Sequence, residues 1–423
     1  MVAHADSRIG MPFDDMDPTT VLVPVEVRQA RIERLRAAAE EAGLSALVIF
    51  SWGVKINNGT HGSLRFLLDW TSWGAATMLV LPVKGELTIV VPGPYDPPWM
   101  RELCPWLEDL RLEGAPNHGK LARRILTERG IKGRIGLIGA HELNSKIHGE
   151  LTAADGAWTF EAADVLLQKQ RMVKDEIGLA RMRRAAATTD LMFEAAADVL
   201  RKPGTPVWKV MAAMNAAANL EGAELVFSWV TAGAVPDRTR GRREENLAPL
   251  RVGDCVICAA IITQGGYYGH ALRTFTIGEP AEDHLRVYRA VSEAQDAAAA
   301  TLRPGISARM PTVAAEEVMF RHFPDAREGD RLRFQPTHYI GQDYAEYPTA
   351  LVSRPPTHDR AIVAGEPTFV DIPLQVGMTI ENHPNLRPPG LGFSCIGDIF
   401  VVTPTGGERL SKYPAELGVI EPG

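Results

Sequence analysis

Two long apolar runs separated by a glycine turn constrain the fold of this 423-residue chain more than any other feature. Residues 255–262 and 267–277 both have the composition of buried strands. The Gly265-Gly266 pair between them favours a tight turn, and strands joined by so short a turn pair antiparallel. We therefore expect a long β-hairpin within the second half of the chain.

Helix and strand patterns alternate through the first half of the chain, which is typical of a small α/β domain. Apolar runs typical of buried strands lie at 46–50, 77–81, 87–91 and 135–139. A long helical pattern then begins at about Asp175. These patterns predict an N-terminal arm over residues 1–20, an α/β domain over 21–170 and a second domain over 171–423.

Composition narrows the class of protein. The chain is 45% hydrophobic and 23% charged, as in an ordinary globular protein. Its net charge of -7 argues against a nucleic-acid partner, because phosphate binding requires a basic surface. No apolar run is long enough to span a membrane, and four cysteines are too few for a disulfide framework. We expect a cytoplasmic protein that acts on a small molecule and binds neither nucleic acid nor membrane.

Short motifs of the second half follow one another in a definite order. They are Leu250-Arg251-Val252-Gly253-Asp254, Arg273-Thr274-Phe275, His338-x-x-Gly341, Glu346-x-Pro348 and the run 373–381, which ends in Glu381. In this order they resemble the creatinase, prolidase and aminopeptidase P superfamily of M24-like peptidases. The resemblance implies an α+β fold, in which a C-terminal pita-bread domain follows a smaller creatinase-like α/β domain. It also implies a homodimer.

The peptidases of this superfamily hold two divalent metal ions with two Asp, one His and two Glu. The matching positions here are Ala259, His270, His338, Glu381 and Gly397. Both bridging carboxylates are therefore missing, and the repulsion between two cations would be uncompensated. We expect no dinuclear centre. A further histidine that the peptidases use, just before Glu346, is replaced by Ala345.

The side chains that remain could still form a site. We predict that His270, His338, Glu381 and His383 bind one divalent transition metal ion, because imidazoles and a carboxylate suit such ions. In a metal-free alternative, His338 or His270 is the catalytic base and Glu381 orients it. A structural alternative has His270 fill a vacated ligand position and hydrogen-bond Glu381. Glu346 is a further catalytic candidate, with an orienting or structural role as its alternative.

Candidate substrate-binding residues are Arg240, Trp70, Trp73 and Tyr268. Arg240 lies in the arginine-rich run 238–243 and could hold a substrate carboxylate, although the run also fits a solvated charged surface. The aromatic residues could form a wall of the pocket or serve only in packing.

These residues lead us to expect a non-peptidase enzyme that acts on a small, carboxylate-bearing metabolite. Hydrolysis of a non-peptide C–N bond in a creatinase-like pocket is the first expectation, because most small-molecule relatives cut such a bond. The alternatives are base-catalysed elimination by a lyase, a non-catalytic pita-bread binding protein, and a residual Xaa-Pro peptidase.

Overall fold

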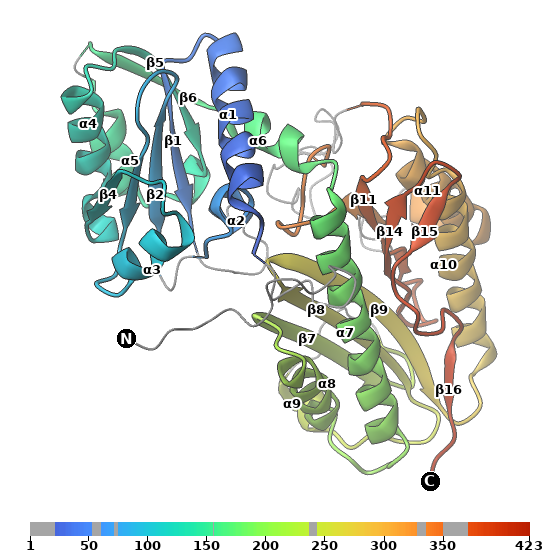
Figure 1. Ribbon diagram of the computed structural model, residues 1–423. Helices are drawn as coiled ribbons and strands as arrows, with labels where there is room; N and C mark the ends of the chain where they lie inside the picture. Colours follow the sequence, from blue (N-terminus) through green and yellow to red (C-terminus); the bar gives the residue numbers. More distant parts are fainter. Residues whose placement is uncertain are drawn as a thin grey trace, which may run out of the picture.

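The computed structural model describes residues 22–52, 61–71, 75–154, 156–236, 243–327, 336–349 and 371–423. The predicted arm, Trp73 and Arg240 lie outside these ranges. Within them the chain forms two units, which Figure 1 shows side by side and joined through helices α6 and α7. These two helices span Asp164–Arg171 and Glu176–Leu200.

The N-terminal unit is built on a six-stranded mixed sheet with the order β4-β3-β2-β1-β5-β6. Its strands are β1 (Ala46–Ser51), β2 (Thr77–Pro82), β3 (Thr88–Val91), β4 (Asp109–Leu112), β5 (Gly133–Ile138) and β6 (Trp158–Ala162). Its helices are α1 (Val25–Glu41), α2 (His61–Leu68), α3 (Asp96–Leu103), α4 (His118–Glu128) and α5 (Ser145–Thr152). Gly43, at φ +71°, ends α1.

Every residue of the central strand β1 is buried, because helices cover both faces of the sheet. Leu47 and Ile49 pack with α1, α2 and α3. Val48 and Phe50, on the opposite face, pack with α4 and α5. Alternate side chains of a strand point to opposite faces, so a continuous apolar run supplies two cores.

The C-terminal unit begins with α7, whose first turn is capped by the Asp175 side chain accepting from Gly178 N at 2.9 Å. The predicted hairpin is confirmed as β8 (Cys255–Gln264) and β9 (Tyr267–Ile277). It forms a sheet of order β16-β9-β8-β7. The other elements of this layer are α8 (Trp208–Leu220), β7 (Leu225–Gly233), α9 (Arg243–Leu247) and β16 (Gly418–Ile420).

A second four-stranded sheet, of order β10-β11-β14-β15, faces the hairpin layer. Its strands are β10 (Thr337–Tyr339), β11 (Thr379–Asn382), β14 (Asp398–Val402) and β15 (Gly407–Arg409). The short pair β12 (Asn385–Leu386) and β13 (Ser394–Cys395) lies against α10 (Glu282–Ala300), which packs on α11 (Met310–His322). A bridge between Leu272 and Gly397 joins the two larger sheets.

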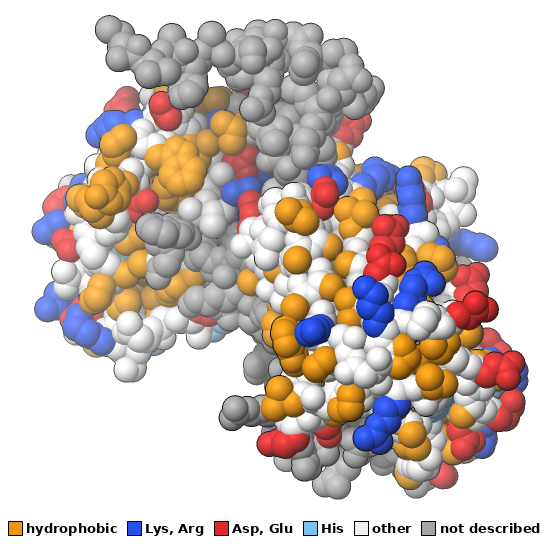
Figure 2. Space-filling view, turned by 90° about the horizontal axis from the view of Figure 1, so that it is seen from below, with side chains coloured by type: hydrophobic (Ala, Val, Ile, Leu, Met, Phe, Trp, Pro, Cys, Tyr) orange, Lys and Arg blue, Asp and Glu red, His pale blue; other side chains and the backbone are white. Residues whose placement is uncertain are grey.

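The expected α+β fold class is therefore confirmed. Helix α7 and the helices α10 and α11 lie on opposite outer sides of the two sheets, as Figure 1 shows. No helix in the described part of the chain is long and apolar enough to cross a membrane. On the face shown in Figure 2, basic and acidic side chains are interspersed.

Buried ion pairs hold the two units together. Asp69, which follows α2, accepts from Arg181 of α7 at 3.0 and 2.9 Å, and both side chains are 1% exposed. Asp69 also accepts from the backbone of Val23 at 3.0 Å. Burial opposes ionisation of Asp69, but the hydrogen bond and charge of Arg181 outweigh it and lower its pKa. Asp69 therefore stays ionised inside the junction.

We expect Asp69→Asn to lower the free energy of unfolding by about 3–5 kcal/mol, because it leaves the Arg181 guanidinium buried without its counterion. Urea denaturation at neutral pH measures this change. Since the folded-state pKa of Asp69 is lowered, its contribution should be complete above the ordinary value and disappear as the pH falls through the folded value.

The matched control is Arg183→Ala, which breaks an exposed pair with Glu408 on the outer side of α7. This change should cost less than about 1 kcal/mol. If both variants lowered the free energy of unfolding equally, burial of the Asp69–Arg181 pair would contribute nothing to stability.

Candidate functional site

The candidate site lies between the two sheets of the C-terminal unit, where their inner faces meet. His338 on β10 and Glu381 on β11 are directly opposite residues of an antiparallel pair. Opposite residues project to the same face, so the strand register itself places the imidazole beside the carboxyl group. His270 on β9 reaches the same point from the other sheet, with Nδ1 3.7 Å from Oε1 of Glu381.

Three imidazoles gather around this carboxyl group, and we call His270, His338 and His383 the imidazole cluster. Their ring centres are 5.8 Å apart for His270 and His338, 5.6 Å for His270 and His383, and 5.0 Å for His338 and His383. All three side chains are buried, with exposed fractions from 4% to 8%. The structure thus brings together all four residues predicted as metal ligands.

Glu381 carries the carboxyl group around which the three imidazoles gather. Its side chain is fully buried, and neither carboxyl oxygen accepts a hydrogen bond from a described residue. Burial raises the pKa of Glu381 well above its usual value, and the nearby charge of Asp398 adds to the shift. A buried carboxyl group without hydrogen bonds is costly to maintain, so its retention favours a chemical role over a packing role.

Tyr344 covers the imidazole cluster and was not identified from the sequence. Its ring centre is 4.7 Å from that of His338 and 5.3 Å from that of His270, and Tyr268 packs edge-on against it at 5.8 Å. Tyr344 lies beside Ala345, where the superfamily peptidases carry a histidine. The loss of that histidine was the one available signal that this loop had changed.

The residues present do not fit two metal ions. Such a centre requires carboxylate ligands that neutralise both cations, and Ala259, His270 and Gly397 stand at three of the positions where the resemblance implies such carboxylates. For a single ion the donor types are suitable. However, no three His, Cys, Asp or Glu side chains in the described ranges lie close enough together to hold an ion as they stand.

The distances between the ring centres of the imidazole cluster can be compared with those expected around one bound metal ion. Metal–nitrogen bonds of about 2.0–2.1 Å place the ring centres of tetrahedrally arranged imidazoles about 5 Å apart. The separations of 5.0 to 5.8 Å in the cluster are close to that value. Binding of one ion would therefore require side-chain adjustment rather than a change of fold.

Glu346 makes contacts that favour a structural role. It forms a 2.8 Å ion pair with Lys174 and lies 3.7 Å from Arg171, and all three side chains are at most 2% exposed. Its carboxylate also accepts from the backbone of Gln342 and Asp343. Burial opposes ionisation, but the charges of Lys174 and Arg171 outweigh it and lower the pKa of Glu346. Its predicted catalytic role remains a prediction that these pairings do not favour.

Of the candidate substrate-binding residues that the structure describes, Trp70 lies in the N-terminal unit and Tyr268 lies beside the imidazole cluster. Trp70 is 1% exposed, donates to the Thr77 hydroxyl at 3.1 Å and packs against Trp99 in the core of the N-terminal unit. It belongs to the packing alternative, because its indole is enclosed by its own unit. Tyr268 is fully buried and contacts the site through Tyr344.

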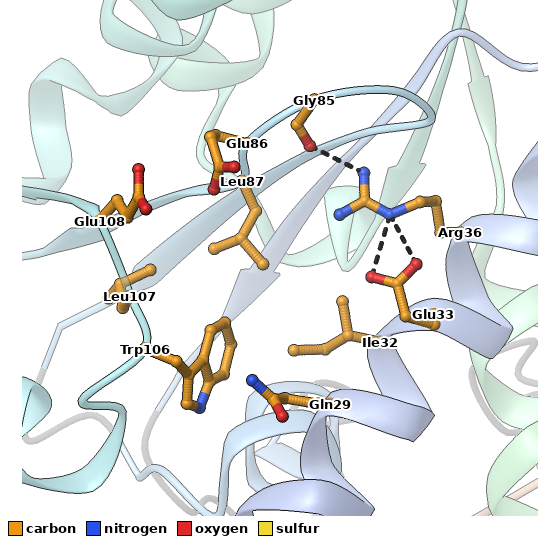
Figure 3. A pocket seen from close by; sticks show the side chains of 10 residues that line it. All are labelled: Gln29, Ile32, Glu33, Arg36, Gly85, Glu86, Leu87, Trp106, Leu107 and Glu108. Atoms are coloured by element: carbon orange, nitrogen blue, oxygen red, sulfur yellow. Dashed lines mark hydrogen bonds and ion pairs between the residues drawn. The ribbon is translucent and has the colours of Figure 1, made fainter.

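A separate cleft of about 370 Å³ lies in the N-terminal unit, between α1 and the segments that follow β2 and α3. Figure 3 shows Ile32, Leu87 and Trp106 on its walls and the Glu33–Arg36 pair at its edge. None of the residues that line this cleft is a histidine. The acid–base candidates of this cleft are therefore the carboxyl groups of Glu33, Glu86 and Glu108, and the histidines named above lie elsewhere, in the C-terminal unit.

Known proteins resemble this chain over both of its units. The model of metallopeptidase family M24 matches residues 180–404. The probable dipeptidase PepE of Mycobacterium tuberculosis is 29% identical over 413 residues, which cover 93% of this chain and 97% of that protein. The crystal structure of dipeptidase PepE from Mycobacterium ulcerans superposes with a TM-score of 0.74 at 27% identity, covering 95% of this chain and 100% of that one.

A relative with a different name matches over the same extent. The agropine synthesis cyclase of Rhizobium rhizogenes is 29% identical over 420 residues, covering 93% of this chain and 97% of that protein. Together the matches confirm the resemblance derived from the motif order, including the pita-bread fold and the preceding N-terminal domain.

The expectation of a non-peptidase enzyme for C–N hydrolysis or elimination is wrong. The two PepE relatives, which match over nearly the whole chain, are named dipeptidases, and these names point to peptide hydrolysis. The error came from treating the loss of the bridging carboxylates as the loss of the reaction. Among the alternatives considered, the residual peptidase is the one that the comparisons favour.

We expect Glu346→Gln to lower the free energy of unfolding by about 3–5 kcal/mol, because Lys174 would remain charged and buried without its partner. The matched control is Glu293→Gln, which breaks an exposed pair with His322 and should cost less than about 1 kcal/mol. Chemical denaturation compares the two. Unchanged stability of Glu346→Gln would restore Glu346 as a catalytic candidate.

Proposed function

The chain belongs to metallopeptidase family M24, and we propose that it hydrolyses the peptide bond of dipeptides or similarly short peptides. The observation that carries this proposal is the joint position of His338, Glu381 and His270 at one buried point of the fold. Two of these residues, His338 and Glu381, stand at positions where the resemblance keeps the family's own ligand types. The named dipeptidases that match along the whole chain support the same reaction.

The chemistry of the site rests on paired imidazole and carboxyl groups. Hydrolysis of a peptide bond requires a group that takes a proton from water and a group that returns a proton to the leaving nitrogen. In the proposed mechanism without a metal ion, His338 or His270 takes the proton from water, and the imidazolium so formed returns it to the leaving nitrogen. The carboxyl group of Glu381 is on the residue opposite His338 and lies 3.7 Å from Nδ1 of His270, so it would orient the base. The Tyr344 ring packs against the imidazoles of His338 and His270 and helps to hold them in position.

The cofactor that this donor set supports is a single divalent transition metal ion. In this alternative His270, His338, His383 and Glu381 would hold the ion, and the imidazoles would serve as ligands instead of as the base. When bound, such an ion would polarise the substrate carbonyl and acidify a water molecule. A small peptide substrate, a homodimer, and the absence of nucleic-acid and membrane partners complete the proposal.

The test is a panel of dipeptides, including Xaa-Pro sequences, incubated with purified protein with and without added Mn²⁺, Co²⁺ or Zn²⁺. We expect release of free amino acids, with kcat/KM reduced about 10²–10⁴-fold in His338→Ala, because that variant removes the acid–base imidazole. His322→Ala, which alters a partly exposed imidazole at the end of α11, should keep the parental rate. Equal rates in the two variants would exclude the imidazole cluster as the site of hydrolysis.

Ring closure is a second candidate, favoured by the match to the agropine synthesis cyclase. A cyclase joins two groups of one substrate molecule, so its site needs acid–base residues but no attacking water. Mass spectrometry of the same dipeptide panel separates the two reactions. Hydrolysis adds one water molecule to the substrate, whereas closure to a cyclic dipeptide removes one.

A further inference from the structure

The positions of the missing carboxylates are not empty. A Cβ atom added to Gly397 would lie 2.4 Å from Cδ1 of Leu272, 2.9 Å from Oε1 of Glu381 and 2.9 Å from Cβ of His383. Contacts under about 3 Å with a packed side chain require that side chain to move. Position 397 therefore has no room for a side chain while Leu272 keeps its place.

Leu272 occupies this space because its neighbours on both sides are small. It is directly opposite Ala259 in the β8–β9 pair and is bridged to Gly397 of the second sheet by two backbone hydrogen bonds of 3.0 Å. Opposite residues project to the same face of a sheet. Ala259, Leu272 and Gly397 thus form one row across three neighbouring chain segments, with the single large side chain in the middle.

The row is part of a packed apolar cluster. Leu272 is 5% exposed and packs with Ile257, Ala259, Phe393 and Cys395, and Trp229 lies against the same cluster. Packing of this kind fills space at the density of an organic crystal and leaves no room for a hydrated cation. Its apolar atoms also offer a cation no ligand.

Hydrogen bonds from the side chain of Arg273 to backbone carbonyl groups hold the row in place. Arg273 is 1% exposed and donates to the carbonyl oxygens of Leu272 and Gly397 at 2.8 and 2.9 Å. It also donates to the Asp398 carboxylate at 2.7 Å. Withdrawal of Leu272 from the space above Gly397 would therefore have to occur through its side chain, because the backbone on both sides is held.

We propose that Leu272 closes the second metal position, so that this member of a two-metal family binds at most one divalent ion. The small residues Ala259 and Gly397 make room for the Leu272 side chain between them. The loss of the two carboxylates and the presence of Leu272 therefore belong to the same packing arrangement. Restoring a glutamate at 397 alone would therefore not restore a dinuclear centre. Leu272 is in this sense the residue that determines the number of metal ions.

Metal stoichiometry tests this inference independently of catalytic activity. The purified protein is equilibrated with Mn²⁺, Co²⁺ or Zn²⁺, dialysed, and analysed by inductively coupled plasma mass spectrometry and by calorimetric titration. We expect zero or one equivalent per chain. Two equivalents, or two anomalous-scattering peaks about 3.5–4 Å apart in a metal-soaked crystal, would overturn the proposal.

Variants separate the steric cause from the loss of ligands. Gly397→Glu should bind no more metal than the parent and should have a lower Tm, because its side chain overlaps Leu272. Adding Leu272→Ala and Ala259→Asp to Gly397→Glu should raise the Tm above that of the single variant and raise the metal content. A second equivalent in Gly397→Glu alone would show that Leu272 does not close the position.

The matched control is Gly406→Glu, because a Cβ at this partly exposed glycine meets no atom within 4 Å. It adds the same carboxylate away from the site and should leave the stoichiometry unchanged. Its φ of +155° makes some loss of stability expected there as well, so the comparison is made on metal content. A rise in metal content in this control equal to that in the triple variant would attribute the gain to charge alone and contradict the proposal.

Discussion

Buried charge pairs between distant segments are the interaction on which the rest of this structure depends. Asp69 and Arg181 join the end of α2 to α7, and Arg171 forms an ion pair with Asp343. The other carboxylate oxygen of Asp343 accepts from the backbone of Gly62. Because a buried charge without a partner is strongly destabilising, each pair restricts the two units to one relative arrangement.

The same ionic contacts reach the candidate site. Asp343 and Glu346 flank Tyr344 in the loop after β10, and both are paired with cations of the segment that links the two units. The ring of Tyr344 packs against the imidazoles of His338 and His270. The position of the Tyr344 ring beside the imidazoles is thus coupled to the junction.

The site combines a retained half and a replaced half of an ancestral pocket. His338 and Glu381 keep the family's residue types, and His270 and His383 add imidazoles beside them. On the other side, Leu272 fills the space between Ala259 and Gly397 with packed apolar atoms. The family and its dipeptidase relatives favour peptide hydrolysis, while the packing limits the cofactor that can assist it. The strands that carry His270, His338 and Glu381 are held by backbone pairing, so replacement of neighbouring side chains is compatible with the same fold.

The sequence alone determined the β8–β9 hairpin and the strands β1, β2, β3 and β5 of the first sheet, since these follow from apolar runs and turn residues close together in the chain. The fold class came from the order of motifs that resemble the superfamily. Motif order also located the replaced ligand positions at 259 and 397. Only the tertiary structure placed Glu346 against Lys174, 172 residues away, enclosed Trp70 in the core, and put Leu272 over Gly397. Those outcomes depend on contacts between segments that are remote in sequence, and no local pattern encodes which remote side chain will fill a given space.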